Sequence, residues 1–135
     1  MPVRKPSFPP IAMIGAALGA LAIATGAFGA HALQPFLTEQ GMGSAWETAV
    51  LFNLLHAVAI SALGWTFGPV PWSNRSGLVG LAWILGTSLF SGSLYLLALG
   101  GPRWLGPITP LGGLLLLIGW LLAIFLRPDR SVRPD

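Results

Sequence analysis

The sequence predicts an all-α integral membrane protein, a bundle of four transmembrane helices with the N- and C-termini both cytoplasmic. Hydrophobic residues make up 54% of the chain and charged residues only 8%, whereas about 25% of residues are charged in ordinary soluble domains. The charges also divide the chain into four uncharged runs. Each run reaches the roughly 20 helical residues needed to cross a hydrocarbon core.

The four runs give the expected helices in order. Because backbone polar groups in lipid must be paired within their own segment, helices are the form available to runs of this length. Gly and Pro signals trim the runs to helices near residues 11–33, 45–67, 77–99 and 105–126. The connecting segments are too short for a further domain, so residues 1–135 are expected to form one transmembrane domain.

Lys and Arg are distributed unevenly between the two ends of the predicted bundle. Six of the seven fall in the N-terminal segment, the second loop and the tail, and only Arg103 falls on the other side. The six are Arg4, Lys5, Arg75, Arg127, Arg130 and Arg133. The positive-inside rule therefore places both termini in the cytoplasm. Cleavage of the first run as a signal peptide is the alternative, but its apolar core of about 20 residues exceeds the usual 7 to 15.

Composition also bears on chemistry and partners. The chain has no cysteine, which excludes disulfides, thiolate metal sites and cysteine nucleophiles. The net charge of +3 comes from side chains that flank apolar runs, so we expect a lipid bilayer and no nucleic acid as partner. The two histidines are predicted at heights about 14 Å apart, which disfavours haem, and zinc would lack a clear third ligand. We expect no enzyme activity, catalytic residue, cofactor or metal site.

Small residues line one face of the first predicted helix. They recur at spacings of three and four and include a GxxxG pattern. The face consists of Ala12, Gly15, Gly19, Ala22, Gly26 and Ala30. Such a face lets another helix backbone approach closely. We expect it to pack within the bundle, with contact between copies in a homo-oligomer as the alternative.

Polar residues are predicted to gather in the outer half of the bundle. Asn53 and His56 share a face of the second helix, and the third helix offers hydroxyl groups at matching depths. The candidate cluster comprises His31, Asn53, His56, Ser88, Ser91, Tyr95 and Thr109. We expect His56 to face the interior near Ser88, Ser91 or Tyr95. A hydrogen-bonded structural cluster is the favoured interpretation, and a ligand- or proton-handling site and a lack of convergence are the alternatives.

The tryptophans are expected to play two different parts. Trp46, Trp72 and Trp104 fall at predicted helix ends, where an indole can lie at headgroup level. Trp83 and Trp120 fall inside helices, where we expect them to pack or to face lipid.

Four motifs occur in order along nearly the whole chain: "GAFGAHAL" (26–33), "WETAVLFNLLHA" (46–57), "FSGSLYLLAL" (90–99) and "LGPITPLGG" (105–113). The chain resembles the domain of unknown function 423 family, which includes YgdD-like and transmembrane protein 256-like small membrane proteins. The resemblance implies a four-helix, multi-pass protein of the bacterial inner membrane or of related organelle membranes. It implies no reaction.

The expected function is therefore that of a non-enzymatic accessory or assembly partner of a larger membrane complex. The alternative is an oligomeric transporter or channel for protons or small solutes that uses the polar cluster.

Overall fold

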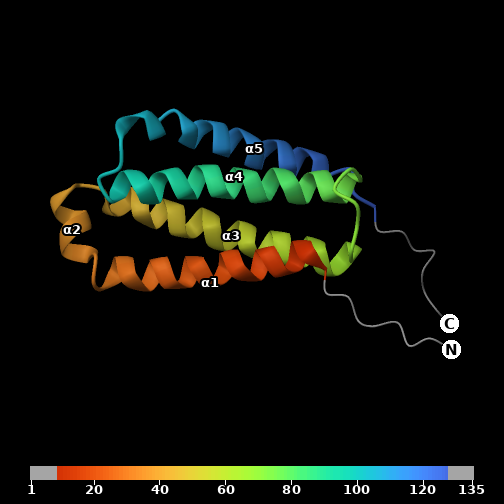
Figure 1. Ribbon diagram of the computed structural model, residues 1–135, viewed down its shortest axis with the longest axis horizontal. Helices are drawn as coiled ribbons and strands as arrows, with labels where there is room; N and C mark the ends of the chain where they lie inside the picture. Colours follow the sequence, from red (N-terminus) through yellow and green to blue (C-terminus); the bar gives the residue numbers. More distant parts are fainter. Residues whose placement is uncertain (1–8, 128–135) are drawn as a thin grey trace.

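The computed structural model describes residues 9–127, and this part of the chain is all helical (Figure 1). The elements are α1 (Pro10–Ala30), α2 (Gln34–Glu39), α3 (Gly43–Phe67), α4 (Arg75–Ala98), the 3-10 helix η1 (Arg103–Leu105) and α5 (Ile108–Ala123). Four segments are long and apolar enough to span a membrane: α1, α3, α4 and the stretch from η1 through α5. The predicted fold class is confirmed. The predicted cytoplasmic location of the termini rests partly on Arg4, Lys5, Arg130 and Arg133, which lie outside the described residues.

The four long helices run antiparallel in chain order. α1 packs on α3, α3 on α4 and α4 on α5, and α1 and α5 lie at opposite edges of this row (Figure 1). The bundle is therefore open rather than closed. At one end lie α2 and η1, which we call the α2 end; the α3–α4 loop lies at the other, together with the start of α1 and the end of α5 (Figure 1).

Seven of the eight predicted helix boundaries differ from the structure by one to three residues, and only the end of α3 at Phe67 agrees. The first helix ends at Ala30 and not at residue 33, because the chain turns at residues 31–33 and begins the short helix α2. The last helix begins at Ile108 and not at residue 105, because Leu105 belongs to η1 and Pro107 occupies the N-cap position of α5. Proline is favoured around a helix start because it lacks the N–H that a helix interior requires.

Glycines set the close contact between α1 and α3. A Cβ added at Gly15 would lie 2.6 Å from the backbone N of Ser61, so the two backbones touch there. A Cβ at Gly19 would make an ordinary contact, 3.6 Å from the Cβ of Ala57, and one at Gly26 would lie 3.2 Å from Val50 Cγ1. The small-residue face of α1 thus packs on α3 of the same chain.

The α4–α5 contact is built in the same way. A Cβ at Gly86 would lie 2.9 Å from the backbone N of Leu116, and one at Gly112 would lie 2.8 Å from the Cα of Phe90. Close backbone approach gives extensive van der Waals contact, which drives helix association where lipid removes the hydrophobic driving force. Large apolar side chains remain exposed on all four long helices, as a lipid environment requires.

Candidate functional site

The interior polar side chains form separate hydrogen-bonded groups rather than one cluster. The first, which we call the Tyr95 group, joins α1, α3 and α4 through Thr25, Asn53 and Tyr95. The hydroxyl oxygens of Thr25 and Tyr95 lie 3.0 Å apart, and Asn53 Nδ2 donates to the Tyr95 hydroxyl at 3.4 Å. Trp46 packs edge-on against Tyr95 with ring centroids 4.8 Å apart, and its indole N–H donates to the carbonyl of Thr25 at 2.9 Å.

His56 forms the second group, in the middle of α3. Its Nδ1 lies 2.8 Å from the carbonyl oxygen of Phe52, and its Nε2 lies 3.1 Å from the indole Nε1 of Trp120 on α5. A carbonyl oxygen can only accept and an indole N–H can only donate. The geometry therefore fits a neutral imidazole that carries its proton on Nδ1, with both ring nitrogens hydrogen-bonded.

Four buried polar side-chain atoms have no hydrogen-bond partner among residues 9–127. They are Asn53 Oδ1, Thr87 Oγ1, Ser91 Oγ and Trp83 Nε1. Thr87, Ser91 and Tyr95 recur every four residues and so form one stripe of α4, and Tyr95 meets Asn53 of α3. A buried polar atom without a partner costs about 1–3 kcal/mol, and such atoms occur both on this stripe, at Thr87 and Ser91, and beside His56, at Trp83.

The structure brings together only some of the predicted cluster. Asn53 and Tyr95 meet as described, and Ser91 is buried on the same stripe. His56 is buried, with 5% of its surface exposed, but the expectation that the third helix supplies its hydrogen-bond partner is wrong. His56 lies three residues, or about 300°, after Asn53, so it sits on the flank of that face and is reached by α5.

The other predicted members lie apart from the Tyr95 group. Ser88 is exposed and donates to the carbonyl of Ile84 in its own helix at 2.8 Å, while the neighbouring Thr87 is buried. Thr109 pairs with Ser93, their hydroxyl oxygens 2.6 Å apart. His31 is exposed at the C-cap of α1, because α1 ends before it. These three are corrections to the predicted cluster.

Sequence reasoning missed Thr25, Trp46 and Trp120 as hydrogen-bonding residues. Trp46 was expected at headgroup level but is buried, and its helical spacing to Asn53 is the signal that could have revealed this. Trp120 was expected only to pack or to face lipid. Its neighbours along α5 are apolar on every side, so the sequence gives no sign of its bond to His56.

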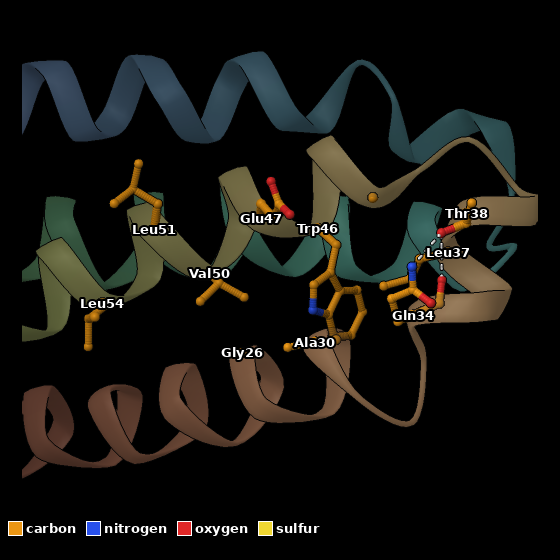
Figure 2. Close-up of a pocket in the computed structure, with 12 residues that line it drawn as sticks. Gly26, Ala30, Gln34, Leu37, Thr38, Trp46, Glu47, Val50, Leu51 and Leu54 are labelled. Carbon is orange, nitrogen blue, oxygen red and sulfur yellow. Dashed lines mark hydrogen bonds between the residues drawn. The ribbon is translucent and has the colours of Figure 1, made fainter.

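A groove of about 420 Å³ lies between α1, α2 and α3 at the α2 end, and we call it the α1–α3 groove (Figure 2). Small residues on its α1 side include Gly26 and Ala30, and α3 supplies apolar walls such as Leu54. Gln34 and Thr38 of α2, joined by a 3.2 Å hydrogen bond, form a polar part of the lining (Figure 2). The groove thus combines an apolar body with polar groups at the bundle end.

Glu47 of α3 also lines this groove, which gives it one acidic group. Figure 2 shows Trp46 pointing from α3 towards α1, while the adjacent Glu47 points away from α1. Within residues 9–127, no three His, Cys, Asp or Glu side chains cluster closely enough to hold a metal ion. The arrangement is suited to packing and hydrogen bonding.

Comparisons with known proteins add the following. A family model described as a protein of unknown function (DUF423) matches residues 25–113. A UPF0382 membrane protein of Staphylococcus haemolyticus is 42% identical over 112 residues, covering 83% of this chain and 89% of the relative. The UPF0382 membrane protein YwdK of Bacillus subtilis is 32% identical over 83% of this chain and 90% of its own length. A UPF0382 membrane protein of Schizosaccharomyces pombe is 36% identical over 79% of this chain and 92% of its own length. No solved structure matches the chain.

Proposed function

Because the chain belongs to the DUF423 family, as its four motifs predict, and its relatives are named only as membrane proteins, we propose its role from geometry. The chain is a non-enzymatic accessory or assembly partner of a larger complex in the bacterial inner membrane. The observation that carries this proposal is the α1–α3 groove, which opens beside an edge helix of the row.

The groove favours a transmembrane helix as its occupant. Ala30 at the end of α1 is small and exposed, which leaves room for the close approach by which helices associate in lipid. Val50 and Leu54 of α3 supply an apolar wall. A partner helix with an apolar, small-residue face matches this surface.

Glu47 indicates the charge that the partner helix carries at this end of the groove. A carboxylate at the end of an apolar groove is complementary to a Lys or Arg side chain, which can reach the membrane boundary along its apolar stem. The proposed occupant is therefore an apolar helix that carries a basic residue near its end, opposite Glu47.

The surroundings of His56 favour this role over proton transport. A proton carrier must release and regain a proton, whereas both ring nitrogens of His56 are already hydrogen-bonded, to Phe52 and Trp120. A protonated ring would direct an N–H at the N–H of Trp120. His56 therefore fits a structural role.

Site-specific photo-crosslinking of the full-length chain in its native membranes tests the proposal. A photoreactive amino acid at Leu54, in the groove, should give an adduct whose mapped peptide is an apolar helix of another membrane protein with a basic residue near its end. The same probe at Leu114, exposed on α5 at the opposite edge, should not. Ala30→Trp, which fills the groove, should abolish the adduct at position 54.

Other outcomes would overturn the proposal. Equally strong adducts from the probes at positions 54 and 114 would show that the groove is not the docking surface. An adduct at position 54 that persists in Ala30→Trp would show the same. An adduct only with a second copy, together with solute leakage from liposomes that contain the purified protein, would support the transporter alternative.

A further inference from the structure

A second groove lies at the end of the molecule opposite α2. It has a volume of about 440 Å³ and is lined by Arg75 and Leu78 of α4 and by Leu122 and Phe125 at the end of α5. Ligand pockets commonly measure about 300–1,000 Å³. The groove thus has an apolar part, formed by three side chains, and one positively charged group, the guanidinium of Arg75.

The charges around this groove are all of one sign in the part of the chain that the structure describes. Arg75 is the first residue of α4, and Arg127 follows two residues after Phe125. The two acidic residues of this part, Glu39 and Glu47, belong to α2 and to the start of α3 at the other end. No described carboxylate therefore competes for Arg75 at its own end, and the groove is complementary to an anion.

We propose that the α4–α5 groove binds an anionic phospholipid. The phosphate accepts hydrogen bonds from the Arg75 guanidinium, and one acyl chain lies along Leu78, Leu122 and Phe125. Arginine suits this role because its planar fork of N–H groups matches phosphate oxygens and is always charged. An apolar wall below the charge favours a lipid over a free anion, since only a lipid occupies both parts of the groove.

Native mass spectrometry of the full-length protein in mild detergent tests whether the charge of Arg75 holds the lipid. Phosphatidylglycerol should be retained in preference to phosphatidylcholine with the same acyl chains. Arg75→Gln should weaken this retention about tenfold, the loss expected for a charge-assisted hydrogen bond. Arg103→Gln removes the same charge at the α2 end and should leave retention unchanged.

A second pair of variants tests the apolar part without changing charge. Leu78→Trp fills the groove and should reduce phosphatidylglycerol retention while Arg75 is intact. Leu96→Trp changes an exposed leucine 18 residues further along α4, at the other end, and should have no effect.

Three results would overturn the assignment. Equal retention of the two lipids would exclude anion selectivity. Equal losses of phosphatidylglycerol retention in Arg75→Gln and Arg103→Gln would show that retention depends on the overall charge of the protein and not on Arg75. Normal retention in Leu78→Trp would show that the acyl chain does not lie in this groove.

Discussion

The indole N–H of Trp120 on α5 donates to the Nε2 of His56 on α3 at 3.1 Å. α4 lies between these two helices in the row. Trp83 of α4 packs beside both, with its ring centroid 4.7 Å from that of Trp120 and 6.4 Å from that of His56. Side chains from three helices therefore meet at one imidazole. This contact links α5 directly to α3, in addition to its packing on α4.

Breaking this hydrogen bond should destabilise the fold from either side. His56→Leu leaves the Trp120 N–H without its partner, and Trp120→Phe leaves His56 Nε2 without a donor, so each should cost about 1–3 kcal/mol. The double variant should cost less than the sum of the two, because both partners are then removed together. Equilibrium unfolding in mixed detergent measures this coupling, and strictly additive losses would contradict it.

His56→Gln separates a structural role from a titrating one. Glutamine keeps an acceptor and a donor but does not titrate near neutral pH. We expect His56→Gln to retain most of the stability that His56→Leu loses, and to leave any measurable phenotype unchanged. A folded His56→Gln protein that has lost its phenotype would instead support proton handling.

Two glycines on one face of α1 should respond differently to the same change. A Cβ at Gly15 meets backbone atoms of α3, 2.6 Å from Ser61 N and 2.9 Å from Ala57 O, whereas one at Gly19 finds an ordinary contact at 3.6 Å. Gly15→Ala should therefore destabilise the protein by about 1–3 kcal/mol, as overpacking does, while Gly19→Ala should be close to neutral. Thermal unfolding in detergent would contradict the α1–α3 packing if both variants behaved alike.

The spans and one packing face could be predicted because strong physical constraints produce them. Lipid requires helices of a minimum length, and charges mark their ends. The three-residue spacing of Asn53 and His56 predicted that both lie on an interior face of α3, and both are buried. The six-residue helix α2 gave no such signal, because it is too short to show a period.

Side-chain direction on α4 and α5 could not be predicted in the same way. Thr87 and Ser88 are both hydroxyl residues about 100° apart on the helix, and the choice between them depends on how α4 is rotated against α3. The structure buries Thr87 and exposes Ser88. On α5 the residues around Trp120 are apolar on every side, so periodicity could not show which residues face α3 and α4.

The orientation predicted from the distribution of Lys and Arg can be tested directly. A reporter active only in the cytoplasm should work when fused after Asp135. A reporter active only in the periplasm should work when inserted at Gly41, in the turn between α2 and α3. The reverse pattern would overturn the orientation derived from the six-to-one distribution of Lys and Arg.

The Tyr95 group offers a test in which one substitution should compensate for another. Tyr95→Phe removes the hydroxyl that contacts both Thr25 and Asn53. Asn53 Oδ1 already has no partner in the described part of the chain, so this variant leaves the whole buried amide unpaired. The expected loss is about 1–3 kcal/mol in unfolding free energy.

Adding Asn53→Leu to Tyr95→Phe should recover part of that loss, because replacing both partners of a buried hydrogen bond by apolar groups of similar shape is often nearly neutral. Ser88→Ala is the matched control, since Ser88 is exposed and bonds only within its own helix, so its effect should fall below about 0.5 kcal/mol. If the double variant is less stable than Tyr95→Phe alone, the amide of Asn53 must have a partner beyond Tyr95, and the stripe of Thr87 and Ser91 is where that partner would lie.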